Sequence, residues 1–263
     1  MDAGKKMLSN GKIVIQSDLK KIIQDQKFLS ISEDWRVEAF RNIMTCLEDN
    51  AFPCFFGRNA CRKNSLRFAF IGEKKTIVEM VGALTEFTQS IANTELEDRL
   101  YSPLLIVFKE NEFKKLTDEH DFAWNRIQEM HDHDISPWPK TIPTETDNSE
   151  WSFCFGGVEL FINVSCPSHT QLKSRNLGRH VVFVINPREH FDVLASHKTP
   201  KGRNIREKIR HRVDSYNGGI VPAELGFYGD SDNLEWKQYI LNEHDSNSRS
   251  RCPLHIQKKE NSL

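Results

Sequence analysis

The stretch WSFCFGGVELFINV, residues 151–164, decides the fold class of this 263-residue chain. Apolar residues alternate with small or polar ones around Gly156-Gly157, which is typical of two strands joined by a two-glycine turn. Further strands are predicted at residues 66–71, 104–108 and 181–185, and helices at residues 32–50, 76–93, 112–131 and 202–216. Because helices and strands do not alternate regularly, we predict an α+β fold, a single domain whose mixed, mostly antiparallel sheet is flanked by helices.

The chain divides into three predicted parts. Residues 1–31 are polar and rich in lysine, with a weak helical pattern at Leu19, Ile22 and Ile23, and we expect a loosely ordered lead-in. Residues 32–243 form the predicted domain, whose first helix has Ser32 as its expected N-cap. Residues 244–263 are charged and poor in large apolar residues, which is typical of a flexible tail.

Composition narrows the classes of function. The net charge of −1 argues against binding to nucleic acid or to an anionic membrane. A basic helix at residues 203–212 can touch nucleic acid or an acidic redox partner, but its acidic neighbours Glu207 and Asp214 favour a solvated face. No apolar run is long enough for a secretory signal or a membrane span, and the six cysteines form no C-x-x-C pair. These features predict a cytoplasmic protein with free thiols.

Four stretches combine residue types that suit a functional site, whereas the usual hydrolase, kinase and dinucleotide-binding motifs are absent from the sequence. Residues 52–67 place phenylalanines beside arginines, a combination that suits a planar anionic ligand. Residues 151–157 include Cys154, whose thiolate can ligate haem iron. Residues 166–178 place His169 on a turn after a strand, and histidine is the commonest proximal ligand of haem iron.

The fourth stretch, residues 131–139, alternates histidine and aspartate before Pro137-Trp138-Pro139. Such residues can bind a metal ion or relay protons. Each of the four stretches also has a purely structural explanation: a core turn with solvated arginines, strand packing, a surface histidine, and a polar helix end. On the residues alone, the structural explanation is favoured for each.

Taken together, the stretches resemble the bacterial YqcI/YcgG family. The matching residues follow one another in order across residues 35–241, nearly the whole chain, and the ordered set is more specific than any single motif. They are Phe52-Pro53-Cys54, Phe56-Gly57-Arg58, Ser65-Leu66-Arg67-Phe68, Pro137-Trp138-Pro139, Trp151 to Gly156, Pro167 with His169, Ser174-Arg175 with Gly178, Ile209-Arg210 with Arg212 and Tyr216, and Trp236 to Tyr239.

The resemblance implies a haem-dependent oxygenase, because characterised relatives are haem proteins that N-hydroxylate arginine or related guanidino compounds. It implies haem b as the cofactor, with His169 as the iron ligand and His131 as the second choice. A guanidino- or amino-bearing small molecule is the expected substrate, with dioxygen or peroxide as the oxidant. An electron-supplying partner protein and a homodimer are further expectations.

The resemblance also implies roles for other side chains. Arg58, Arg67 and Arg175 would pair with the haem propionates, Phe56, Phe153 and Phe155 would form the walls around the macrocycle, and Asp132 or Asp134 would recognise the guanidinium of the substrate. The alternative from a different class is a non-catalytic protein that binds haem or another small ligand on the same scaffold.

Overall fold

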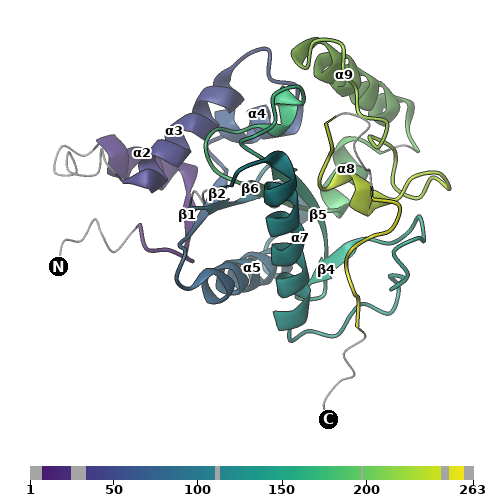
Figure 1. Ribbon diagram of the computed structural model, residues 1–263, viewed down its shortest axis with the longest axis horizontal. Coiled ribbons are helices and arrows are strands. Elements are labelled where there is room, and N and C mark those ends of the chain that lie inside the picture. Colours follow the sequence, from purple (N-terminus) through teal and green to yellow (C-terminus); the bar gives the residue numbers. More distant parts are fainter. Residues whose placement is uncertain (1–7, 25–33, 110–112, 197, 244–248, 258–263) are drawn as a thin grey trace.

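A computed structural model describes residues 8–24, 34–109, 113–196, 198–243 and 249–257 (Figure 1). It confirms the predicted α+β class, with a six-stranded sheet of order β1-β2-β3-β6-β5-β4. The strands are β1 (Ile13–Ile15), β2 (Arg67–Ile71), β3 (Leu104–Phe108), β4 (Phe153–Phe155), β5 (Val158–Ser165) and β6 (Val182–Pro187). The helices are α2 (Gln16–Gln24), α3 (Trp35–Glu48), α4 (Phe55–Arg62), α5 (Thr76–Ala92), α6 (Leu96–Arg99), α7 (Leu116–His133), α8 (Glu189–Leu194) and α9 (Pro200–Tyr216), with short 3₁₀ turns η2 (Lys173–Arg175) and η3 (Glu235–Gln238).

The sheet is mixed and mostly antiparallel, as predicted. The β2–β3 pair is parallel, and the chain between these two strands contains α5 and α6. The β1–β2, β3–β6, β6–β5 and β5–β4 pairs are antiparallel. Gly156 and Gly157 form the predicted hairpin turn between β4 and β5, both with positive φ. A side chain at Gly156 would also meet Thr88, whose Oγ1 lies 2.5 Å from the position of a Cβ atom.

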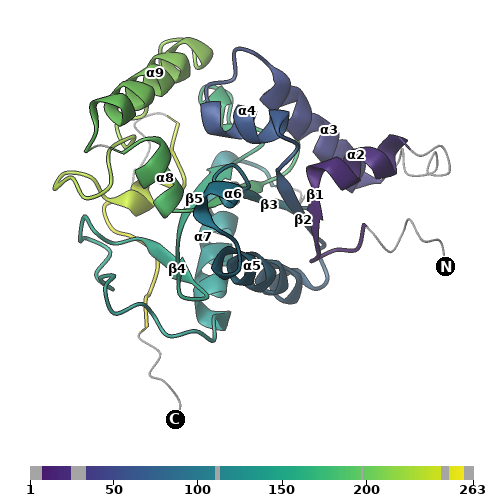
Figure 2. The same cartoon turned by 180° about the vertical axis from the view of Figure 1, so that it is seen from behind.

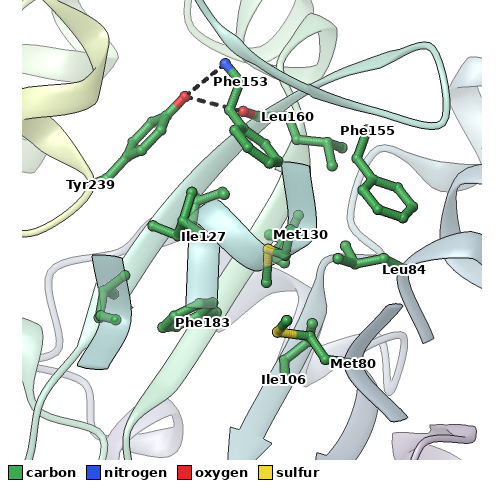
Figure 3. Packing of buried hydrophobic residues seen from close by; sticks show 14 of the residues in the cluster. Met80, Leu84, Ile106, Ile127, Met130, Phe153, Phe155, Leu160, Phe183 and Tyr239 are labelled. Carbon is green, nitrogen blue, oxygen red and sulfur yellow. Dashed lines mark hydrogen bonds between the residues drawn. The ribbon is translucent and has the colours of Figure 1, made fainter. Parts of the chain in front are cut away.

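Two hydrophobic cores lie on opposite faces of the sheet. The first contains the buried faces of α5 and α7, represented by Leu84 and Ile127, and alternate strand residues such as Phe183 (Figure 3). The second contains the buried faces of α2, α3 and α4 and the residues of β2 and β3 that point the other way. The central strands are therefore covered on both faces, which explains why β3 is apolar throughout.

Several elements differ from the prediction. Asp34 caps α3 through its side chain, which accepts from the backbone N–H of Arg36, whereas the expected cap, Ser32, lies outside the described residues. The apolar turn expected near Pro53 is followed by α4, whose N-cap is Cys54. The strand β1 and helix α8 were also missed, because both are short.

The two predicted end segments contain packed residues. In the lead-in, β1 pairs with β2, and Leu19 of α2 is buried in the second core. In the tail, Leu254 is buried against the first core. A weak helical pattern in the lead-in and a few scattered apolar residues in the tail are thus sufficient to dock these segments on an existing core.

Tyr239 connects the C-terminal segment to the hairpin. Its buried hydroxyl accepts a hydrogen bond from the backbone N–H of Phe153 at 3.1 Å and lies 3.3 Å from the carbonyl oxygen of Leu160 (Figure 3). The same hydroxyl donates to the carboxyl group of Glu235 at 2.7 Å. This network fixes the segment that follows η3 against β4 and β5.

We predict that Tyr239→Phe lowers the free energy of unfolding by about 1–3 kcal/mol, because the Phe153 N–H and the Glu235 carboxyl then lose a buried partner. Urea denaturation measures the change. Tyr101→Phe is the control, since its hydroxyl forms no hydrogen bond with the described residues, and we expect a change within about 0.5 kcal/mol. Equal stability of Tyr239→Phe and the wild type would contradict the proposed role of this hydroxyl.

Candidate functional site

Three buried side chains converge where β5 ends beside the N-terminal half of α7. They are His120 of α7, Cys166 directly after β5, and His169 on the following turn. One potential ligand atom from each lies within 4.8 Å of the other two. The turn is fixed locally, because the backbone N–H of His169 donates to the carbonyl of Cys166, and the N–H of Cys166 donates to the carbonyl of Arg175.

The carboxylate of Glu243 holds the His169 ring. Its Oε1 lies 3.2 Å from Nδ1 of His169 and accepts hydrogen bonds from the backbone N–H groups of Gln171 and Leu172, both at 2.7 Å. A carboxylate can only accept, so the imidazole proton is on Nδ1 and the lone pair is on Nε2. Nε2 of His169 is buried and has no hydrogen-bond partner among the described residues. Such a carboxylate–histidine pair is typical of histidines that ligate metals.

Burial keeps both imidazoles neutral near pH 7. Burial lowers the pKa of His169 to about 4, against the opposing effect of Glu243. Burial, with a smaller contribution from His169, also lowers the pKa of His120 to about 4. Nε2 of His120 likewise has no partner among the described residues. Two neutral imidazole nitrogens are thus available as ligands in this cluster.

The other polar groups nearby are less suited to bind iron. Burial, and then Glu119, raises the pKa of the Cys166 thiol well above its usual value, so the thiol stays protonated near neutral pH. Glu119 accepts from the hydroxyl of Ser168 at 2.6 Å and from its backbone N–H at 3.1 Å. Burial raises the pKa of Glu119. Burial acts in the same direction on Glu243, but the hydrogen bonds from the backbone N–H groups of Leu172 and Gln171 outweigh it and leave the pKa of Glu243 below its usual value.

Arg175 brings a buried cation to the edge of the cluster. Its guanidinium donates to the backbone carbonyls of Gln238 at 3.0 Å and Tyr239 at 3.5 Å. Burial lowers its pKa to about 10, so it remains charged at neutral pH. Cys54, Cys166 and Glu224 each raise its pKa slightly through their electrostatic interaction with the guanidinium.

His120 borders a small hollow that shares two lining residues with a larger one. The small hollow, about 30 Å³, is lined by apolar Trp124, Trp236 and Ile240 and by polar residues that include Arg249. A larger open hollow of about 650 Å³ lies beside it, and Glu224 and Lys237 line both. The large open hollow therefore lies near the histidine cluster, separated from it by the small one.

The residues present fit a haem axial ligand. His169 offers a buried lone pair without a partner among the described residues, and Glu243 fixes the orientation of its ring. The predicted partner Arg175 lies near the cluster, as its interaction with Cys166 shows. The structure thus brings two of the sequence-predicted residues, His169 and Arg175, close together.

The other predicted cofactor residues lie elsewhere. Arg58 donates to Asn50, and Arg67 donates to Ser90 and lies over the ring of Phe87 at 5.7 Å. The remaining three are the predicted wall residues: Phe56 packs against Phe191 with ring centroids 6.1 Å apart, and Phe153 and Phe155 are buried in the first core.

The predicted acidic and second histidine residues gather at the far end of α7. Nε2 of His131 accepts from the backbone N–H of Gln257 at 2.9 Å. Asp132 is exposed and accepts a hydrogen bond from the side chain of Gln128. It lies about 18 Å along α7 from His120, since each helical residue adds about 1.5 Å. Asp134 is buried and accepts from the backbone N–H groups of Ser136 and Gly156 at 2.9 and 2.8 Å, a structural role at the hairpin.

Sequence reasoning missed His120 and Glu243. His120 precedes Ala123, Trp124 and Ile127 on the buried face of α7. A histidine in such an apolar stripe was the available signal. Glu243 gave none, because its distance of 74 residues from His169 leaves no local pattern.

Comparisons with known proteins agree with the ordered motifs. The family model described as YqcI/YcgG matches residues 40–255. The chain belongs to the YqcI/YcgG family. No solved structure gives a significant match.

Two relatives illustrate how the YqcI/YcgG family has been described. A Streptomyces lavendulae protein, provisionally named N(omega)-hydroxy-L-arginine synthase DcsA, is 40% identical over 223 residues, which cover 83% of each chain. The uncharacterized protein YqcI of Bacillus subtilis (strain 168) is 32% identical over 247 residues, covering 90% of this chain and 92% of YqcI. Within the described part of this family member, no helix is long and apolar enough to cross a membrane.

We predict that the free energy of unfolding falls as the pH drops from 7 to 5. The lowered pKa values of His120, His169 and His190 mean that the unfolded state binds more protons between about pH 6.5 and 4. Stability from these groups is therefore complete above pH 6.5 and is lost as the pH falls toward 4. In urea titrations, His120→Gln should show a shallower fall than the wild type.

The matched control for this pH dependence is His211→Gln, which removes an exposed histidine of α9. It should keep the wild-type slope. An unchanged slope in His120→Gln would show that this imidazole is not held neutral by the fold.

Proposed function

We propose that the chain N-hydroxylates a guanidino- or amino-bearing small molecule such as arginine, with haem b bound through His169. The observation that carries the proposal is the His169 ring, which is buried and neutral, with Nδ1–H on Glu243 and no partner for Nε2 among the described residues. The substrate class is supported by the S. lavendulae relative, whose name refers to hydroxy-arginine synthesis.

Several residues of the chain would have distinct roles in this reaction. When bound, haem would supply the activation of dioxygen or peroxide. Nε2 of His169 would ligate the iron, and Glu243 would orient the ring and strengthen its donor character. Trp124, Trp236 and Ile240 offer apolar surface beside His120, in a hollow of about 30 Å³ that would have to widen to admit the macrocycle, and Arg249 is a cation there that suits a propionate.

One observation favours a second candidate, a compact metal ion bound without a macrocycle. His120, Cys166 and His169 each bring a potential ligand atom within 4.8 Å of the other two. This convergence would suit a single ion held by two imidazoles and by Cys166, whose thiol would lose its proton on binding the ion. Metal and haem analysis of the purified protein separates the two cofactors.

We predict that His169→Ala abolishes haem binding. Protein expressed with a haem precursor should show a Soret band at one haem per chain, and the variant should lose it, because the iron loses its axial donor. His133→Ala, which removes an exposed histidine of α7, should keep the band. A full Soret band in His169→Ala would exclude this histidine as the ligand, and well-folded wild type without any band would exclude the haem proposal.

The reaction is tested with L-arginine, an electron donor and dioxygen, or with peroxide. Mass spectrometry should detect a product with one additional oxygen atom on the guanidino group. Haem-loaded protein that gives no oxygenated product from arginine or from a panel of guanidino and amino compounds would support the alternative, a non-catalytic haem-binding protein.

A further inference from the structure

The larger hollow beside the histidine cluster is built by one segment of the chain. Residues 221–237 run from the end of α9 to η3, next to α9 in both views (Figures 1 and 2). These residues, together with Arg210 of α9, line the hollow of about 650 Å³. That volume accommodates a free amino acid with a long side chain.

Two arginines of α9 hold this segment in place. Arg210 donates to the carbonyl of Leu225, and Arg206 donates to the carbonyl of Gly226 at 3.4 Å. Both guanidinium groups also lie over the ring of Phe227, that of Arg206 at 4.9 Å from the ring centroid and that of Arg210 at 5.1 Å. The backbone directly after Glu224 is thus anchored, so this wall of the hollow is preorganised.

Glu224 occupies the junction of the two hollows. It lines both the large hollow and the small one that borders His120. It is also a charged neighbour of the buried Arg175, which in turn neighbours Cys166 of the histidine cluster. These shared neighbours place Glu224 on the side of the large hollow nearer to the cluster.

The carboxylate of Glu224 is not used by the fold. It forms no hydrogen bond or ion pair with another residue in the described part of the chain. Lys237, the other residue shared by the two hollows, places its ammonium 5.6 Å from the Trp236 ring centroid. The large hollow therefore presents three acids, Glu224, Asp230 and Asp232, and two cations, Lys237 and Arg210. Of the three acids, Glu224 is the one that also lines the small hollow bordering His120.

We propose that Glu224 binds the guanidinium group of the substrate in this hollow, on the side shared with the small hollow that borders His120. The proposal rests on the proposed function for its substrate class. A carboxylate accepts two parallel N–H bonds from a guanidinium, whereas a neutral urea of the same shape cannot supply the same charge. Lys237 and Arg210 then provide cations for the α-carboxylate of an arginine-like ligand.

Binding is tested by calorimetry on the purified protein without turnover, using L-arginine, agmatine and L-citrulline. Agmatine keeps the guanidinium and lacks the carboxylate, whereas citrulline keeps the carboxylate and replaces the guanidinium with a neutral urea. Arginine should bind about tenfold or more tighter than citrulline, the size expected for a charged hydrogen-bonded pair. Agmatine should also bind, more weakly than arginine.

Glu224→Gln should remove the preference for arginine over citrulline. Glu207→Gln removes the same charge from an exposed position of α9 and should keep the preference. Circular dichroism and thermal melts establish that both variants fold. Equal binding of arginine and citrulline to the wild type, a preference retained in Glu224→Gln, or no binding of arginine would each overturn the proposal.

The binding site at Glu224 and the proposed hydroxylation can fail independently. Binding that depends on Glu224 in a protein that forms no oxygenated product would retain the site and reject the hydroxylase. Hydroxylation of arginine with an unchanged KM in Glu224→Gln would retain the hydroxylase and overturn the site.

Discussion

The arrangement of the candidate site depends on the carboxylate of Glu243. It accepts hydrogen bonds from the turn after β5, at Gln171 and Leu172, and from the His169 ring. One charged group therefore joins a turn and a C-terminal segment that are more than 70 residues apart, and the same group determines the tautomer of His169. Without it, a buried imidazole would have neither a fixed orientation nor a defined free nitrogen.

The C-terminal segment that carries Glu243 is itself held by the hairpin. Tyr239 places its hydroxyl between Phe153 and Glu235, and its backbone carbonyl accepts from Arg175. Side chains from the same segment line the hollow beside His120. Residues 235–243 therefore couple three features: the packing of the core, the orientation of His169 and the shape of the hollow beside His120. A substitution in this segment should affect all three.

The sequence was informative where patterns are local. The hairpin at Gly156-Gly157, the apolar strand β3 and the helices α5 and α7 follow from periodicity and turn residues. Site residues were predictable only where a motif marked them, as with His169 on its turn. The aromatic and arginine motifs near Phe56 and Phe153 are largely used in packing, and the partners of His169 are brought to it by tertiary contacts that no spacing reveals.

Replacement of the His169 imidazole tests most directly the proposal that its Nε2, oriented by Glu243, would ligate haem iron. His169→Gly leaves a cavity that free imidazole can enter. Haem absorption and arginine hydroxylation, both lost in the variant, should return when imidazole is added, while the wild type should be unaffected at the same concentration. A variant with wild-type absorption before imidazole is added, or one that imidazole leaves unchanged, would contradict the account.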